Sequence, residues 1–537
     1  MTRGSNIVGP ALGVLLIATA IVLLLGFFEV KAAALEPAAE AADGPSCRWG
    51  ASTTGVDQVA WLDDVGAGWH VYFGGFTDAA GAGVQIAAVI SVKQDKNGAE
   101  YLDTYTINPP LDALALVIET HPGTLWIVGN EVDRGPNPDD LTTGQGDTYP
   151  DVYARAYEEA YHFIKEIDPT ALVANSGLVQ VTPGRLQYLD LMWQAYQDQF
   201  GEPMPVDVWN MHIYVLPEAE LDGTPNGIAN VALGTDPALA KRGPGANRYQ
   251  CVLDEIYCFA EHDDVNLFEH QARAMRQWMF DHGQWQKPLI LSEFSILYPC
   301  DDPEGVNCDY LRDEFGNDFD RQRVKNYLAA TTARLENMTD PIIGNPLDDG
   351  RLVQQWAWFS IHSTTQVGDV SDLVKKDSSG KLIGLTEIGQ AYQARATAAP
   401  KYVNLVPARV DGGTAETTGL EGTVDVPLSA TIVNNGSLAY SGPITVTFYA
   451  DSELTQIIEQ VQTEAGGVDS PLLRGCAANT IPVSVTWSGL TSGLHPFWVQ
   501  VEGQGSESGN VAQDFVLVDP ERHWMTIVGR YSEAAAP

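Results

Sequence analysis

Trp126-Ile-Val-Gly-Asn-Glu131 and Pro288-Leu-Ile-Leu-Ser-Glu-Phe294 are two short apolar segments that each run into a glutamate. A short apolar run of this kind is typical of a buried β-strand. A carboxylate at the end of such a run is costly to bury unless the chemistry of a site requires it there. We therefore expect Glu131 and Glu293 to converge on one pocket and to act as a catalytic pair.

The region around these two segments alternates short apolar runs with helical patterns. This alternation predicts an α/β fold, a (β/α)8 TIM barrel that occupies residues 47–400. Strands are expected at 48–53, 69–74, 84–92, 124–131, 171–176, 206–214, 288–293 and 353–359, and helices at 56–65, 111–120, 153–167, 185–200, 267–282 and 320–336. Residues 216–266 have little periodicity, and we place this long loop over the mouth of the pocket.

Polar side chains gather where the expected strands end, and the carboxyl ends of the strands form the active site of such a barrel. In the sixth strand, alternation places Asn210, His212 and Tyr214 on one face, which we expect to point into the barrel. A lone buried histidine is more often a core residue than a catalytic one. Three inward polar residues beside two strand-end glutamates favour a binding role for them.

The last expected strand carries Trp356 and Trp358. An indole ring can stack on the apolar face of a sugar, and a tryptophan packed in the core gives the same sequence pattern. We predict Trp358, with Trp356, as the platform for a sugar.

Two carboxyl groups can break a glycosidic bond when they differ in protonation. One protonates the leaving oxygen, and the other attacks or activates water. Proximity produces the difference, because the charge of one carboxylate raises the pKa of the other.

At this point the sequence resembles clan A of the glycoside hydrolases, the retaining (β/α)8 enzymes that include families 5 and 39. The residues that carry the resemblance are Asn130-Glu131, His212-x-Tyr214, Glu293 and Trp358. The resemblance implies that Glu131 is the acid/base and Glu293 the nucleophile. It also implies that Asn130 binds the 2-hydroxyl of the sugar being cleaved and that Tyr214 lies against the nucleophile.

One residue departs from the clan pattern. Several clan families hold the nucleophile ionised with an arginine near the end of strand two, and residues 69–76 contain none. Arg48 is the candidate substitute.

After Pro400 the pattern changes to period-two strands at 424–433, 443–449, 481–487, 496–501 and 515–518. This pattern predicts an immunoglobulin-like β-sandwich at residues 401–525, followed by a tail at 526–537. Val433-Asn-Asn-Gly436 and the segment Val483–Trp487 resemble the bacterial adhesion-related modules of the CARDB type. That resemblance implies a spacer or a surface-attachment role.

The chain carries 70 acidic and 30 basic residues, a formal net charge of -40. This charge argues against a nucleic-acid partner, because phosphate groups attract the opposite sign. A polysaccharide or oligosaccharide substrate suits it better. No Cys-x-x-Cys pair or cysteine/histidine cluster is present, so we predict no metal and no cofactor.

Residues 1–46 are interpreted as an export segment with a linker. Residues 7–28 are almost continuously apolar, which fits a cleaved signal peptide and a membrane anchor equally well. The six cysteines of an exported chain are expected to form disulfides. Close spacing favours Cys251 with Cys258 and Cys300 with Cys308, which leaves Cys47 with Cys476.

The sequence thus predicts an exported, retaining glycoside hydrolase that cleaves a β-linked glycan with two glutamates. The alternative is a non-catalytic glycan-binding or adhesion protein of the cell surface, built on a degenerate barrel. A metal-dependent barrel hydrolase is disfavoured, because the early strands contain no His-x-His and His70 stands alone.

Overall fold

The computed structural model describes residues 44–519, except for 82, 137–143, 220–221, 224–228, 243–261, 302–312, 314–316, 364–367, 369, 418–421, 468–471 and 507–509. Eight parallel strands form a barrel in the order β6-β5-β3-β2-β1-β9-β8-β7. A parallel bridge between Ala174 and Val208 links the two ends of this order. The strands are β1 (Trp49–Thr53), β2 (Trp69–Tyr72), β3 (Gln85–Asn97), β5 (Leu125–Val128), β6 (Leu172–Ala174), β7 (Trp209–His212), β8 (Leu289–Phe294) and β9 (Gln355–Trp358). Each of the eight predicted strands is confirmed.

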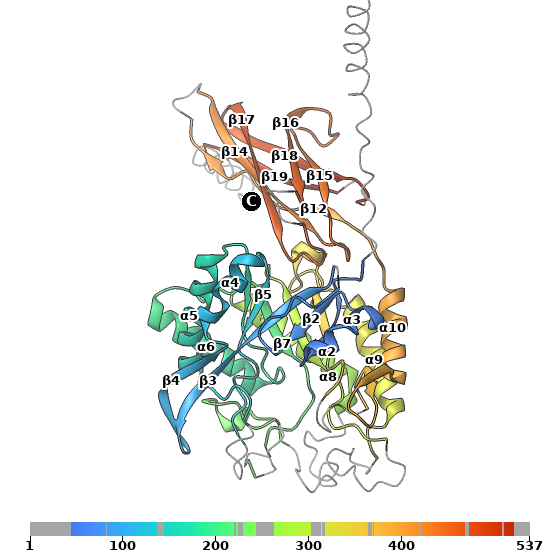
Figure 1. Cartoon of the computed structure of the whole chain (residues 1–537). Helices are drawn as coiled ribbons and strands as arrows, with labels where there is room; N and C mark the ends of the chain where they lie inside the picture. The colour runs from blue at the N-terminus through green and yellow to red at the C-terminus, as the bar shows by residue number, and fades with distance from the viewer. Residues whose placement is uncertain are drawn as a thin grey trace, which may run out of the picture. The chain divides into compact units, whose positions relative to one another are not determined.

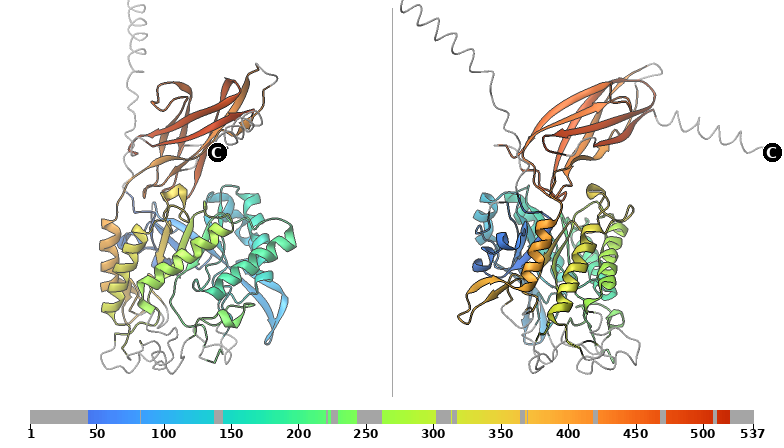
Figure 2. Two further views of the ribbon diagram at one scale, coloured as in Figure 1. Left: turned by 180° about the vertical axis from the view of Figure 1, so that it is seen from behind. Right: turned by 90° about the vertical axis from the view of Figure 1, so that its right-hand side faces the viewer.

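Helices surround the outside of this barrel (Figures 1 and 2). They are α4 (Leu111–Thr120), α5 (Pro150–Ile167), α6 (Pro183–Phe200), α8 (Val265–Asp281), α9 (Arg321–Asn337) and α10 (Glu387–Ala398). The helix predicted at 56–65 is two short helices, α2 (Val56–Val59) and α3 (Leu62–Val65). The sequence analysis missed α10 and also strand β4 (Glu100–Asn108), which pairs with the extension of β3 in an antiparallel hairpin.

Side chains fill the interior of the barrel below the carboxyl ends of its strands. Trp69 and Val71 of β2 belong to a buried cluster with residues of the other strands, such as Ile127 and Ile290. Gly50 of β1 makes room for the indole of Trp69, because a Cβ atom at position 50 would lie 2.4 Å from Nε1 of that ring. The core therefore closes the barrel below its carboxyl end, where the polar residues lie.

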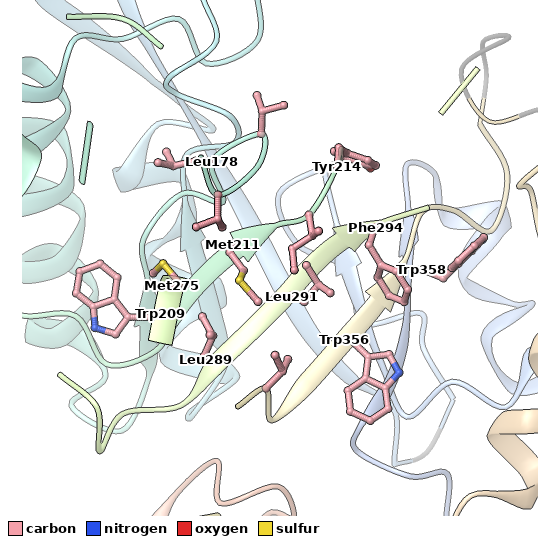
Figure 3. Close-up of a cluster of buried hydrophobic side chains, with 14 of the residues drawn as sticks. Leu178, Trp209, Met211, Tyr214, Met275, Leu289, Leu291, Phe294, Trp356 and Trp358 are labelled. Carbon is pink, nitrogen blue, oxygen red and sulfur yellow. The ribbon is translucent and has the colours of Figure 1, made fainter. Parts of the chain in front are cut away.

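A second apolar layer lies between the strands and the helices. Trp209 and Met211 of β7 and Leu289 and Leu291 of β8 belong to it (Figure 3). Trp209 packs edge-on against Trp278 of α8, with ring centroids 4.9 Å apart. Alternation therefore placed the apolar face of the sixth strand correctly, toward the helices.

The C-terminal part of the chain forms two sheets that share one buried cluster. One sheet has the order β12-β14-β17 and the other β13-β19-β18-β15-β16. The strands are β12 (Leu405–Asp411), β13 (Thr414–Ala415), β14 (Val424–Asn434), β15 (Gly442–Tyr449), β16 (Ile457–Ala465), β17 (Thr480–Leu490), β18 (Gly493–Gly503) and β19 (Val511–Val518). The predicted β-strands are present, and β12, β13 and β16 were missed. The immunoglobulin-like topology and the domain boundaries stay predictions.

Cys47 and Cys476 form a disulfide between the start of the barrel and the β-domain. The backbone N–H of Cys47 also donates to the carbonyl of Ser437, at 2.9 Å. The remaining pair of the predicted disulfide scheme is therefore formed. Cys300 is disulfide-bonded as well. Its expected partner, Cys308, and the predicted pair of Cys251 and Cys258 lie outside the described residues.

The expectation of a transmembrane segment needs a correction. In the part of the chain that the structure describes, no helix combines the length and the apolar character that crossing a bilayer requires. Residues 7–28, on which the expectation of an anchor rested, lie outside that part.

Candidate active site

A cavity of about 370 Å³ opens where the barrel strands end at their carboxyl side. Its floor and walls combine carboxylates, amides and aromatic rings. The lining residues are Thr54, Phe73, Asn130, Glu131, Arg134, Gln145, Val179, Tyr214, Leu216, Glu293, Leu297, Tyr298 and Phe359. The predicted residues Asn130, Glu131, Tyr214 and Glu293 are therefore brought together.

His212 stands between the two glutamates. Its Nδ1 atom lies 3.2 Å from Oε1 of Glu131, and its Nε2 atom lies 3.7 Å from Oε1 of Glu293. One carboxylate oxygen of each glutamate and one ring nitrogen of His212 all lie within 4.8 Å of one another. Two residues distant in sequence thus share one small polar centre.

Glu131 is held by an unusual backbone. Its φ of 46° lies in the left-handed region, which residues with a side chain rarely adopt. Its N–H donates to the carbonyl of Gly177 at 2.9 Å, which ties the loop after β5 to the loop after β6. Gly177 also makes room for His212, because a Cβ atom at position 177 would lie 2.4 Å from the imidazole. Such strain is concentrated at functional sites in proteins.

Burial dominates the electrostatics of Glu293, whose side chain is 7 % exposed. Burial and the charge of Glu131 raise the pKa of Glu293 to about 7, against the opposing effects of His212 and Tyr214. Tyr214 Oη donates to Oε2 of Glu293 at 2.9 Å. This hydrogen bond orients the carboxyl group and favours its ionised form.

Burial would also raise the pKa of Glu131. The hydrogen bond with His212, the charge of that ring and the charges of Arg134 and Arg185 outweigh burial, and the pKa of Glu131 is lowered. Burial likewise would lower the pKa of His212, but Glu293 and Glu131 raise it. The environments push the pKa values of the two glutamates apart, which is the pattern of an acid–base pair.

A buried ionic network supports the loop that carries Glu131, and the sequence analysis missed it. Arg185 of α6 pairs with Asp133 at 2.7 Å and also with Glu218. Oδ1 of Asp133 accepts from the N–H of Val179 at 3.4 Å. The residues of this network lie too far apart in sequence for their spacing to reveal it. The one signal in the sequence was Arg185, a charged residue near the start of a helix.

The tryptophans predicted as sugar platforms do not reach the cavity. Trp356 and Trp358 are both fully buried in the apolar cluster between the strands and the helices, and Figure 3 shows their side chains among those of this cluster. Trp358 packs edge-on against Phe294 at 5.3 Å, and its Nε1 donates to the carbonyl of Ser371. Both are core residues, so the prediction was wrong. Alternation along β9 could have shown this, because the next residue, Phe359, lines the cavity instead.

Asn210 also lies outside the cavity lining. Its side chain is buried, and its backbone N–H donates to Oδ1 of Asn175 at 2.8 Å. Asn175 Nδ2 in turn donates to the carbonyl of Asn210 at 3.2 Å. The two residues link β7 to the end of β6, below the level of the glutamates.

Arg48 cannot take the place of the missing strand-two arginine. It lies before β1, at the amino end of the barrel, and its guanidinium binds both carboxylate oxygens of Asp348, at 3.0 and 2.9 Å. A further bond from its Nη2 reaches the carbonyl of Asn435 at 3.1 Å. The cationic group that contacts both glutamates is the ring of His212.

No protein-family model matches the chain. No curated protein matches it either. Solved structures of glycoside hydrolases are similar to it in fold. One is a GH128 (subgroup III) curdlan-specific exo-β-1,3-glucanase from Blastomyces gilchristii, 13 % identical, covering 66 % of this chain and 100 % of that chain, with a TM-score of 0.36. Another is AbfB, a family 51 α-L-arabinofuranosidase from Bifidobacterium longum, 10 % identical, covering 83 % of this chain and 96 % of that chain, with a TM-score of 0.35.

A third similar structure is the CARDB domain of the PF1109 protein from Pyrococcus furiosus. It is 12 % identical and covers 22 % of this chain and 97 % of its own, with a TM-score of 0.17. All three scores lie below 0.5, so these likenesses carry no argument about the activity of this chain. The chemistry has to be argued from the site itself.

Glu131, His212 and Glu293 also have ligand atoms close enough together to hold a metal ion, the one such group among the residues that the structure describes. These atoms also contact one another, because the two ring nitrogens of His212 lie 3.2 Å from Oε1 of Glu131 and 3.7 Å from Oε1 of Glu293. The prediction of a site without metal stays a prediction. Two carboxyl groups with separated pKa values can transfer a proton and present a nucleophile without one.

Proposed function

We propose that this chain is a retaining glycoside hydrolase that cleaves a β-linked glycan by double displacement. One observation carries the proposal. Two buried carboxyl groups, one from the loop after β5 and one from β8, with oxygens within 4.8 Å of each other, face one cavity with a histidine between them. A spacing of about 5 to 5.5 Å between the carboxyl groups suits retention, whereas inversion needs about 6.5 to 9.5 Å to admit a water molecule.

In the first step of the proposed reaction, Glu293 attacks the anomeric carbon and Glu131 gives a proton to the leaving oxygen. The bond from the anomeric carbon to that oxygen breaks, and a covalent glycosyl-enzyme forms. Glu131 then takes a proton from water, which displaces Glu293 and releases the sugar. Tyr214 orients Glu293 through its bond to Oε2.

Glu131 and Glu293 together must carry one proton for these reaction steps. The lowered pKa of Glu131 and the raised pKa of Glu293 leave that proton mainly on Glu293 in the resting site. The reacting form, with the proton on Glu131, is then the minor arrangement of the same charge state. Since both arrangements carry one proton, they rise and fall together with pH.

The cavity wall supports a sugar substrate. Phe73, Tyr298 and Phe359 offer aromatic surface, while Asn130 and Gln145 offer amides for hydroxyl groups. Asn130 directly precedes Glu131, where the clan resemblance assigns it to the 2-hydroxyl of the sugar.

Kinetics of two variants test the proposal. Glu293→Gln should abolish turnover of aryl β-glycosides. Glu131→Gln should retain far more activity on substrates with good leaving groups than on those with poor ones, because only the latter need a proton donor. Equal losses on both substrate classes would contradict these roles, and an anomer released with inverted configuration in proton NMR would contradict retention.

The absence of an arginine at strand two favours one alternative, a barrel that binds a glycan without cleaving it. Arg48, the candidate substitute, is engaged at the other end of the barrel. Binding of aryl glycosides without release of the aryl group, in wild-type protein, would favour this alternative over the hydrolase.

We also propose that the protein is exported by its N-terminal segment. The disulfide between Cys47 and Cys476 supports this, because structural disulfides persist in oxidising compartments. Recovery of the protein with free thiols at both cysteines from its native cells would contradict export.

A further inference from the structure

The outer face of one β-domain sheet is unusually apolar and aromatic. Tyr449 of β15, Trp498 of β18 and Phe515 of β19 alternate with the buried residues of the same strands and so point away from the core. Phe515 is 49 % exposed, and Leu494 on the same face is 60 % exposed. The three strands are neighbours in the sheet (Figure 1).

The register places the three rings close together. Tyr449 is directly opposite Trp498 across β15 and β18. Phe515 is opposite Pro496 across β18 and β19, one side-chain step along β18 from Trp498. Neighbouring strands lie about 4.8 Å apart, and a step of two residues advances about 7 Å. The rings therefore form a diagonal row across three strands rather than isolated exposed residues.

Uncharged polar groups fill the spaces between the rings. Gln513 is opposite Trp498, and Gln500 accepts a hydrogen bond from Tyr449 Oη at 3.2 Å. Within these three fully described strands, Glu502 is the only charged residue that alternation assigns to this face. The chain as a whole has a formal net charge of -40, so three adjacent strands with one outward charge are a marked exception. Glu464 of the edge strand β16, opposite Pro443, adds a second carboxylate to the face.

We propose that this face binds a neutral polysaccharide chain, as a second glycan site separate from the barrel cavity. Aromatic rings cover the apolar faces of sugar rings, and amide and hydroxyl groups pair with sugar hydroxyls. An open face that spans three neighbouring strands suits an extended polymer. A second copy of this chain fits less well, because burying Gln500 and Gln513 against an apolar partner would cost free energy.

Binding to insoluble polymers tests the proposal without any turnover. The full chain with Glu293→Gln is mixed with microcrystalline cellulose, insoluble β-1,3-glucan or insoluble β-1,4-xylan, and the protein left in solution is measured. We expect saturable binding to at least one polymer. Trp498→Ala with Phe515→Ala should weaken it at least tenfold, while the matched control Leu116→Ala, which removes a 68 % exposed leucine from α4, should not change it.

Two further measurements make the outcome decisive. Phe515→Ala alone, at an exposed position, should weaken binding about threefold with an unchanged melting temperature, and this covers the case in which the double variant fails to fold. No binding to any of the three polymers, or equal binding by all variants, would overturn the proposal. So would a wild-type dimer in light scattering that Phe515→Ala converts to a monomer. None of these results depends on whether the barrel hydrolyses a glycan.

Discussion

The Nδ1 atom of His212 lies 3.2 Å from Oε1 of Glu131, and the same ring approaches Glu293 on its other side. An imidazolium in this place lowers the free energy of two neighbouring carboxylates. The imidazole ring of His212 is a group that can also lose its charge near neutral pH.

His212→Asn tests this relationship. Without the ring, the pKa of both glutamates should rise, because His212 lowers each of them. We expect kcat/KM to fall about 100-fold, within the usual range for groups that take part in acid–base chemistry. The high-pH side of the pH profile should move to higher pH. An unchanged profile would show that His212 does not act on the pair.

The pH dependence of wild-type activity follows from the pair. The proposed reaction needs one proton shared by the two glutamates, and the pKa of Glu293 is raised to about 7. Activity should therefore fall as the pH rises above about 7, and fall again at low pH, where Glu131 also becomes protonated. Tyr214→Phe removes a hydrogen bond that lowers the pKa of Glu293, so it should shift the high-pH side upward. A shift downward would contradict the assignment.

The raised pKa of Glu293 should also make the free energy of unfolding depend on pH. The pKa of Glu293 is about 7 in the fold and 4.5 ordinarily. Between these values the unfolded chain loses a proton that the folded chain keeps, so folding becomes less favourable as the pH rises. Glu293→Gln removes this loss. Its advantage in free energy of unfolding should grow from about pH 4.5 to about pH 7, by up to about 3 kcal/mol.

Thermal unfolding at several pH values measures this difference. Glu119→Gln is the matched control, because the side chain of Glu119 is exposed on α4. Its melting temperature should follow the wild type at every pH. A Glu293→Gln variant that loses stability relative to the wild type above pH 7 would show that the buried carboxylate is well compensated.

Phe359 and Trp358 are adjacent in sequence and should behave in opposite ways. Phe359→Ala should raise KM about tenfold with little change in melting temperature, because Phe359 lines the cavity. Trp358→Ala should destabilise the fold by about 3–5 kcal/mol, as truncation of a buried tryptophan usually does. A large increase in KM for Trp358→Phe, with an unchanged melting temperature, would show instead that Trp358 contacts the substrate.

The disulfide of Cys47 and Cys476 closes a loop with a sequence separation of 429. Constraining a loop of that length should stabilise the chain by about 2–5 kcal/mol. Dithiothreitol should lower the melting temperature of the wild type by more than that of a Cys47→Ser, Cys476→Ser double variant. Equal sensitivity of both proteins would assign the effect to the other disulfide-bonded cysteine, Cys300.

Much of the barrel could be predicted because each strand is a short apolar run that ends at polar residues. The same rule brought Glu131 and Glu293 together, since parallel strands end at one side of a barrel. Alternation was applied to the sixth strand and succeeded there. It was not applied to the eighth, where the same rule would have separated Trp358 from Phe359.

Other features depend on contacts that no local pattern encodes. The ion pairs of Arg185 with Asp133 and Glu218 join three separate segments. Strand β4 has mostly exposed or half-exposed residues, so it lacks the apolar run by which strands were identified. Arg48 is a different case, because the predicted strand at 48–53 already placed it at the amino end of the barrel, away from the site at the carboxyl ends.

The hydrogen bond from the backbone N–H of Glu131 to the carbonyl of Gly177 bears on how the cavity could change over evolutionary time. Insertions in the loop after β6 would displace Glu131 as well as the loop. Position 177 itself tolerates no side chain beside His212. New substrate preferences should therefore arise through the segments around Phe73 and Tyr298, which border the cavity but are not among the contacts that hold Glu131.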